Sequence, residues 1–248
     1  MPTLPDLAAH LARLQTVTAH AGATPDPATG AVTQPLHLST TFRHPANAAG
    51  HTGYLYSRAD NPTRRELEAV LAELEQGEAG FAFSSGVAAI HAALAALRPG
   101  DHVLAHHQLY MGARALLRDF FLPWGLQVEF TDLRDLAAVA TRFTAHTRLI
   151  WAETPSNPLL EGLDLAALAE LAHTHGALLA VDNTFATPVG QQPLALGADL
   201  VMHATTKYLA GHSDVLGGGI VVRTATDYSA RIRQVQQLVG GVPSPFDC

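Results

Sequence analysis

The chain has a single cysteine, Cys248, among 248 residues. One thiol cannot form a disulfide within the chain, which excludes the disulfide-stapled class of small secreted proteins. No apolar run reaches the length that spans a bilayer, and the first residues, MPTLPDLAAH, carry neither a basic region nor a continuous apolar stretch. We therefore expect a cytoplasmic protein that has no membrane partner.

Basic residues are scarce as well. The 15 Lys and Arg residues, nearly all of them Arg, are outnumbered by 22 Asp and Glu residues, which gives a formal net charge of −7. This balance argues against a nucleic-acid partner. The 14 histidines are scattered, and the closest group, His102, His106 and His107, has no recognised zinc-ligand spacing. We predict no metal site, with a zinc centre at this group as the alternative.

Hydrophobic residues make up 48% of the chain, enough for a large buried core. Residues 1–60 differ from the rest because Pro, Gly, Thr and Asn interrupt short segments such as GATPDPATGAV. This composition predicts an extended arm that follows one short helix. From residue 61 to residue 248 the pattern is regular and predicts a single folded unit.

Within residues 61–248, short apolar runs alternate with helical stretches. A T-x-x-E capping box, Thr63 with Glu66, predicts the start of a helix that ends near Gly77. Strands are expected at 81–84, 102–105, 126–130, 148–153, 177–182 and 199–203, with helices between them near 87–97, 113–121, 134–143 and 164–175. This alternation predicts an α/β fold with a parallel sheet covered on both faces. The run at 217–223 follows too soon for a helical crossover, so that strand is expected to be antiparallel.

In open α/β sheets, ligands bind beyond the carboxyl ends of the strands, so polar residues there are candidate site residues. The turn Ser84–Val87 opens a helix whose first N–H groups suit a phosphate, although ordinary capping would look the same. Asp182 ends a strand, where it could pair with a protonated ring nitrogen or serve as a turn residue. Asn157 lies in the Pro-rich loop TPSNP, which could be a simple turn.

Lys207 is the strongest candidate for covalent chemistry. It follows the strand that ends at His203 and precedes the glycine-rich segment YLAGHSDVLGGG. A partly desolvated amine at this position can lose its proton and condense with an aldehyde. The alternative interpretation is a solvated surface lysine.

Several segments resemble, in the same order, the pyridoxal 5′-phosphate (PLP) dependent enzymes of cysteine and methionine metabolism, the trans-sulfuration family. They are YSRADNPT (56–63), SSGVAAIHA (84–92), ETPSNPLL (153–160), VDNTFATP (181–188), QPLALGADLV (192–201) and HATTKYLAGHSDVLGG (203–218). The resemblance covers most of the chain. It implies the large domain of the fold type I PLP-dependent transferases, with a mostly parallel seven-stranded sheet between helices.

The resemblance also implies roles for individual residues. Lys207 would carry PLP as a Schiff base and move protons, Asp182 would keep the pyridine nitrogen protonated, and Tyr110 would stack on the ring. The remaining cofactor contacts would come from Gly86, Val87, Asn157, Thr184 and Thr206, with Tyr56 and Arg58 supplied by the arm of a partner subunit. A homodimer or homotetramer is therefore expected.

Three positions depart from the family pattern. Ala204 stands where a serine usually precedes the lysine by three residues, and Thr205 compensates only if the loop shifts, because neighbouring residues of an extended segment point in opposite directions. Val87 replaces a common methionine, and Met111 interrupts the usual YGG stretch. The end at PSPFDC resembles the point where family members continue into a smaller C-terminal domain, which is absent from this sequence.

The expected function is a PLP-dependent trans-sulfuration reaction on a γ-substituted amino acid, of the cystathionine γ-synthase or γ-lyase type. Substrates would be cystathionine, O-acylated homoserine or cysteine. The alternatives are cystathionine β-lyase or methionine γ-lyase activity, and a catalytically inactive fragment that binds PLP or dimerises. A sugar-nucleotide aminotransferase is disfavoured by the VDNTF and TTKYLAGHSD segments.

Overall fold

The computed structural model describes residues 4–22, 24–44 and 53–248. Its sheet contains seven strands in the order β1-β7-β6-β5-β4-β2-β3. The strands are β1 (Ala79–Phe83), β2 (His102–His106), β3 (Gln127–Thr131), β4 (Thr147–Glu153), β5 (Leu178–Asp182), β6 (Leu200–His203) and β7 (Gly218–Val222). All are parallel except β7, which is antiparallel to both of its neighbours, β1 and β6. The predicted fold class and the antiparallel strand are confirmed.

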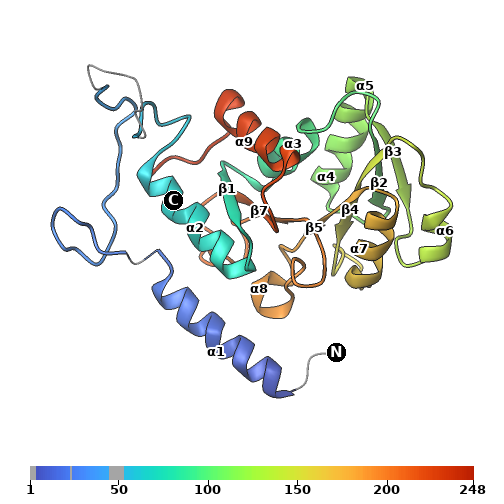
Figure 1. Ribbon diagram of the computed structural model, residues 1–248, viewed down its shortest axis with the longest axis horizontal. Coiled ribbons are helices and arrows are strands. Elements are labelled where there is room, and N and C mark those ends of the chain that lie inside the picture. Colours follow the sequence, from blue (N-terminus) through green and yellow to red (C-terminus); the bar gives the residue numbers. More distant parts are fainter. Residues whose placement is uncertain (1–3, 23, 45–52) are drawn as a thin grey trace.

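Helices cover both faces of this sheet (Figure 1). They are α1 (Leu4–His20), α2 (Pro62–Glu75), α3 (Gly86–Ala95), α4 (Met111–Ala115), the π-helix η1 (Leu116–Phe121), α5 (Leu122–Trp124), α6 (Leu136–Ala140), α7 (Leu165–Thr174), α8 (Thr187–Gly190) and α9 (Asp227–Val239). One face packs against α3, α4, η1 and α9, and the other packs against α2, α6 and α7. None of the helices in the described ranges is long and apolar enough to cross a membrane.

Alternate residues of each strand belong to opposite faces. In β4, Trp151 contacts the α3 side while Ile150 and Ala152 contact the α7 side. In β5, Ala180 lies on the α3 side and Val181 on the α7 side. Because side chains alternate along a strand, the residues that end β4 and β5 project toward the α3 side. This alternation decides which polar side chains meet at the edge of the sheet.

Two local predictions were wrong, at the start of α2 and at the helix expected at 113–121. Asn61, not Thr63, caps α2, because its side chain accepts the N–H groups of Thr63 and Arg64 and Pro62 follows at the first helical position. The helix ends at Glu75, near Gly77 as predicted, and its C-cap residue Gln76 adopts the left-handed conformation. The helix expected at 113–121 is divided into α4 and η1.

The N-terminal region lies beside the rest of the molecule (Figure 1). Its helix, α1, has 17 residues and is not the short helix expected. Leu14 and Val17 of α1 pack on Leu74 of α2. In the described residues after α1, a turn lies around residues 26–31, and an isolated antiparallel bridge joins Thr41 and Tyr56. Residues 1–3, 23 and 45–52 of the predicted arm lie outside the described residues.

A buried carboxylate joins α2, β1 and α9. Glu68 is 5% exposed. Its Oε1 accepts hydrogen bonds from the backbone N–H of Ala82 (3.0 Å) and from Gln236 Nε2 (2.7 Å), and its Oε2 accepts from Arg233 Nη1 at 2.8 Å. Arg64, also buried, lies 3.7 Å from Oε1. A charge that is buried among donors stabilises the fold only while it is fully paired.

We expect Glu68→Ala to lower the free energy of unfolding by about 3 to 5 kcal/mol, because it leaves two arginines without their buried partner. Urea unfolding followed by circular dichroism measures this change. Glu73→Ala, at an exposed position of the same helix, is the control and should change stability by less than about 0.5 kcal/mol. Equal effects from both substitutions would show that the network does not contribute to stability.

Candidate active site

Two acidic residues end neighbouring parallel strands at one edge of the sheet. Glu153 is the last residue of β4 and Asp182 the last residue of β5, and the two are paired in the strand register. Both are buried, with 5% and 6% of their surface exposed. In this fold class, the carboxyl edge of the parallel strands is where ligands bind.

Asp182 is a carboxylate in an environment that disfavours its charge. Burial raises the pKa of Asp182 above its usual value, and hydrogen bonds from Thr184 and the nearby His203 offset only part of this effect. Its Oδ1 accepts the backbone N–H of Thr184 at 3.0 Å. A buried carboxylate of this kind gains most from a partner that brings a positive charge and an N–H donor.

Thr184 links Asp182 to the loop that carries Lys207. The Thr184 hydroxyl oxygen accepts the backbone N–H of Ala204 at 2.8 Å. The Lys207 backbone N–H in turn donates to the carbonyl of Ala204 at 3.1 Å. The Lys207 side chain is exposed, and Lys207 is the only lysine in the sequence. The one ε-amine of the chain therefore lies three residues after Ala204, which contacts the loop that follows Asp182.

The glycines of this region allow the Lys207 loop to contact the turn before α3. A Cβ at Gly86 would lie 2.7 Å from the Cβ of Ala204, and a Cβ at Gly218 would lie 2.2 Å from the carbonyl oxygen of Ser85. Ser85 caps α3 by accepting the N–H of Ala88. The N–H groups of Gly86 and Val87 lie in the first turn of α3, where no preceding helical carbonyl accepts them. They are free to bind an anion.

The departure at Ala204 has a clear structural consequence. Ala204 faces Gly86, whereas the hydroxyl of Thr205 faces Gly217, where a Cβ would lie 2.3 Å from it. Thr205 therefore does not replace a hydroxyl at position 204. The Thr206 hydroxyl exchanges hydrogen bonds with the backbone of Gly217 at 3.0 and 3.1 Å, so in this structure it is already paired within the chain.

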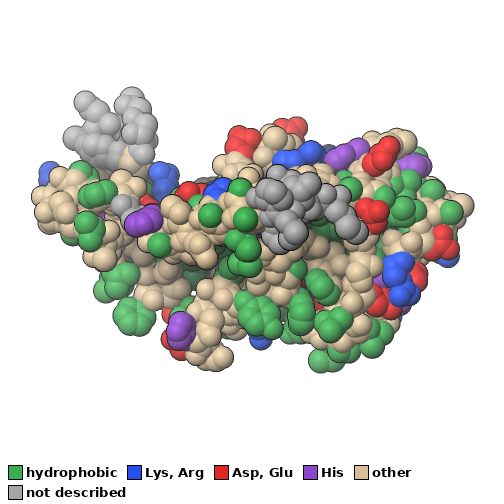
Figure 2. Space-filling model, turned by 90° about the horizontal axis from the view of Figure 1, so that it is seen from below, with side chains coloured by type: hydrophobic (Ala, Val, Ile, Leu, Met, Phe, Trp, Pro, Cys, Tyr) green, Lys and Arg blue, Asp and Glu red, His purple; other side chains and the backbone are tan. Residues whose placement is uncertain are grey.

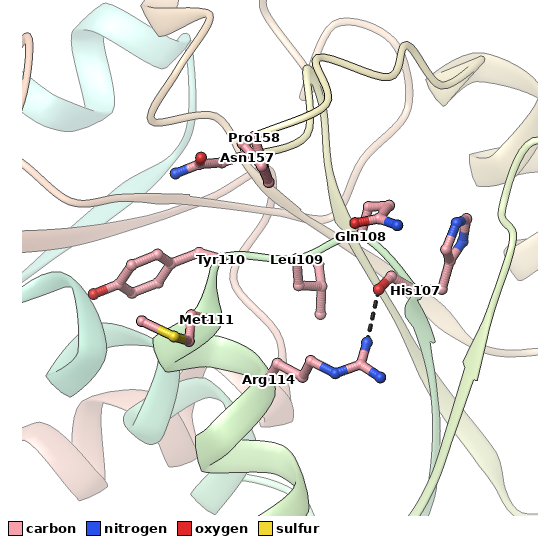
Figure 3. Close-up of a pocket in the computed structure, with 8 residues that line it drawn as sticks. All are labelled: His107, Gln108, Leu109, Tyr110, Met111, Arg114, Asn157 and Pro158. Atoms are coloured by element: carbon pink, nitrogen blue, oxygen red, sulfur yellow. Dashed lines mark hydrogen bonds between the residues drawn. The ribbon is translucent and has the colours of Figure 1, made fainter.

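A cavity of about 580 Å³ brings Tyr110 and Asn157 together (Figure 3). Its other lining residues are His107, Gln108, Leu109, Met111, Arg114 and Pro158. The side chains of Tyr110 and Asn157 extend toward the same side of the view, while Arg114 donates to the carbonyl of His107 at 2.7 Å (Figure 3). Asp182 and Lys207 do not line this cavity, so it forms only one part of the predicted site.

Glu153 is a site residue to which the sequence analysis assigned no role. Its Oε2 accepts the backbone N–H of Tyr110 at 2.6 Å, and its Oε1 accepts that of Asn157 at 3.1 Å. Burial and the neighbouring charge of Asp182 raise the pKa of Glu153 to about 8. The available signal was the charge that ends the apolar strand segment RLIWAE, directly before TPSNP.

Tyr56 and Arg58 lie apart from the cavity. Arg58 stacks over the Tyr56 ring at 5.5 Å and donates to the carbonyl of Gln237 in α9. Gly240 leaves room for this side chain, because a Cβ there would lie 2.7 Å from Arg58 Cδ. Their predicted role toward a partner subunit stays a prediction.

The histidine group is not the one that the sequence suggested. His102 is bonded to Thr147, whereas His106 and His107 approach Asp132, with ligand atoms of these three within 4.8 Å of one another. Nδ1 of His106 accepts the N–H of Leu133, so its Nε2 carries the proton and donates to Glu161 at 3.2 Å. Arg134 pairs with both Asp132 and Glu161. This arrangement is typical of a hydrogen-bonded cluster rather than a metal centre.

The family model described as Cys/Met metabolism PLP-dependent enzyme matches residues 15–248. The chain belongs to this family. The resemblance drawn from the motifs is confirmed, and PLP is the cofactor of the family.

Individual relatives carry more than one activity name. The chain is 49% identical to a cystathionine gamma-synthase of Mycobacterium tuberculosis over 92% of its own length and 59% of that protein. It is 46% identical to a cystathionine gamma-lyase of Bacillus subtilis over 94% of its length and 61% of that protein. A solved cystathionine gamma-lyase from Lactobacillus plantarum, complexed with L-serine, superposes with a TM-score of 0.90 at 41% identity, over 94% of this chain and 61% of that one. The chain thus spans about three fifths of these relatives.

The residues present fit PLP in three respects. The free N–H groups at the start of α3 suit the phosphate, and Gly86 adds no side chain that would obstruct it. Buried Asp182, whose pKa is raised, suits a pyridinium N–H. Lys207 supplies the one ε-amine of the chain. It lies on a loop that contacts the start of α3 and the segment after Asp182.

Proposed function

We propose that this chain binds PLP and that the protein catalyses a trans-sulfuration reaction on γ-substituted amino acids. The observation that carries the proposal is the placement of the single lysine. Its loop contacts the start of α3 through Ala204 and contacts the Asp182 segment through Thr184. The Lys207 amine, the N–H groups at the start of α3 and the buried Asp182 carboxylate are thereby linked by a short series of contacts.

The proposal gives individual residues of this chain the following roles. PLP, when bound, supplies an electron-accepting ring and an aldehyde that condenses with amines. Lys207 Nζ would hold the cofactor through its aldehyde and would accept or donate protons at the substrate carbons. Asp182 would keep a proton on the ring nitrogen, the N–H groups of Gly86 and Val87 would bind the phosphate, and the exposed Tyr110 ring and Asn157 would orient the cofactor ring.

We propose cystathionine γ-synthase or γ-lyase chemistry, with cystathionine, O-acylated homoserine and cysteine as the substrates. Relatives of both names are similar to this chain to nearly the same degree, 49% and 46% identity. Identity alone therefore does not decide between replacement and elimination of the γ-substituent. Arg114 also lines the cavity, but its guanidinium donates to the His107 carbonyl and extends away from the Tyr110 side chain (Figure 3).

We further propose a homo-oligomer. Val32 is 72% exposed, Leu36 52% and Leu38 67%, which is unusual for apolar side chains in one short segment. A second apolar hollow, of about 570 Å³, lies between α1, α2 and residues 185–189 and includes exposed Tyr208. Hydrophobic side chains are visible in several patches on the face seen from below (Figure 2). Association between subunits would cover these surfaces.

The test is a visible absorption titration of the purified chain with PLP, followed by assays with cystathionine and with O-acylated homoserine plus cysteine. We expect a visible band from cofactor bound to Lys207, and turnover of at least one substrate. A band without turnover favours the inactive PLP-binding or dimerising fragment. The absence of any band contradicts PLP binding by this chain.

A further inference from the structure

Two loops border the cavity, and they come from strands that are not consecutive in the chain. Tyr110 follows β2, and Asn157 follows β4. The last residue of β4, Glu153, contacts both loops through the backbone: its Oε2 lies 2.6 Å from the Tyr110 nitrogen and its Oε1 lies 3.1 Å from the Asn157 nitrogen. Each carboxylate oxygen thus accepts a hydrogen bond from the backbone of one loop.

We propose that Glu153 is a positioning residue of the cofactor pocket, whose carboxylate fixes the Tyr110 and Asn157 backbones relative to each other. The inference rests on the proposed PLP site, because Tyr110 and Asn157 are its predicted ring contacts. Glu153 itself does not line the cavity and has no assigned contact with cofactor or substrate. It acts through the two residues that it holds.

The two hydrogen bonds at this position suit a carboxylate. Two backbone N–H groups approach from different loops, and an ionised carboxylate is an acceptor on both oxygens. A glutamine has only one acceptor oxygen, so its NH₂ group would oppose the other N–H donor. Hydrogen bonds to a charged acceptor are stronger than neutral ones, and both bonds are buried with Glu153.

A second buried carboxylate, Asp182, is paired with Glu153 on the adjacent strand. The burial of Glu153 itself, and then the charge of Asp182, make ionisation of Glu153 less favourable, while the two N–H groups favour it. The two hydrogen bonds therefore depend on the ionisation state of Glu153. A cationic ring nitrogen bound at Asp182 would offset the repulsion and strengthen the hold of Glu153 on both loops.

The first measurement uses the wild-type chain without PLP. Amide resonances of Tyr110 and Asn157 are followed by ¹⁵N NMR as the pH is raised. We expect both to shift together with one shared midpoint, because one carboxyl group titrates beneath both of them. Independent midpoints for the two amides would overturn the proposal.

The second measurement compares Glu153→Gln with Glu170→Gln, a change at an exposed position of α7. In Glu153→Gln we expect the shared titration to disappear, hydrogen exchange of at least one of the two amides to accelerate about tenfold or more, and the dissociation constant of PLP to rise about tenfold. Glu170→Gln should change none of these. Unchanged exchange and unchanged PLP affinity in a folded Glu153→Gln chain would contradict the proposal.

These readouts separate the inference from the proposed function. The shared titration and the amide exchange are measured without PLP, so they test the hold of Glu153 on the two loops directly. PLP binding by the wild-type chain tests the cofactor site. Coupled amides without PLP binding would leave the positioning contacts intact and contradict only the cofactor assignment.

Discussion

Replacing Lys207 by alanine is expected to abolish the visible band of bound PLP and to lower turnover by about 10²- to 10⁴-fold or more. The ε-amine is both the covalent anchor of the cofactor and the group that moves protons, so one substitution removes both contributions. Because the sequence holds no second lysine, no other side-chain amine can take its place. Absorption spectra and the coupled assay measure both effects.

The single lysine also allows a direct chemical test. Borohydride reduces a C=N bond between cofactor and lysine to a stable C–N bond, and mass spectrometry then locates the added mass. The label should fall on the peptide that contains Lys207 and be absent from Lys207→Ala. Lys207→Arg keeps the positive charge and is expected to behave like the alanine variant. Cofactor fixed to the alanine variant would contradict the assignment.

Asp182→Asn is expected to weaken PLP binding without destabilising the cofactor-free chain. The neutral amide no longer attracts a pyridinium N–H, and the dissociation constant of PLP should rise roughly 10²-fold or more. Without PLP, the same change removes a buried charge that has no cationic ligand. The free energy of unfolding at neutral pH should therefore stay the same or increase.

The pH dependence follows from the same residue. The pKa of Asp182 in the folded chain is raised above its ordinary value of 3.8. At pH values between the ordinary pKa and the raised pKa, the folded state therefore holds a proton that the unfolded state has lost. Stability due to this group is therefore present at low pH and is lost as the pH rises through that window. Urea unfolding of the cofactor-free wild type and Asp182→Asn at several pH values tests this slope.

The control for both measurements is Asp227→Asn, an exposed aspartate of α9. It should leave PLP affinity and the pH slope unchanged. If Asp182→Asn keeps wild-type PLP affinity, Asp182 does not contact the ring nitrogen. If it destabilises the cofactor-free chain, the carboxylate has a compensating partner in the protein.

Much of the fold could be predicted because short buried strands and helical stretches have different hydrophobic periods. The antiparallel direction of β7 followed from the short connection after Lys207. The cap of α2 was mistaken because Thr63 and Glu66 satisfy a familiar spacing, while Pro62 at the first helical position is the better signal for Asn61. The π-helix was missed because its side chains have no pattern that separates them from an α-helix.

Asp182 and Lys207 could be chosen as candidates from the sequence because Asp182 ends β5 and Lys207 lies in the loop after β6, and their roles stay predictions. Glu153 also ends a strand, but its importance depends on two loops that lie far apart in the sequence and meet only in the folded chain. The opposite orientation of Ala204 and Thr205 followed from the geometry of an extended segment. Which of them faces α3 could be decided only once Gly86 and Gly217 had been placed.

The pairing of β1 has a consequence for how this chain folds. β1 is an edge strand whose one neighbour in the sheet is β7, with Ala79 opposite Val222. The chain between β1 and β7 forms a long loop, and closing a long loop is slow. A nascent chain has to extend beyond β7 before β1 can enter the sheet. The turn at Ser85 follows β1 and lies against Gly218 of β7, so the start of α3, the proposed phosphate site, is completed late in folding.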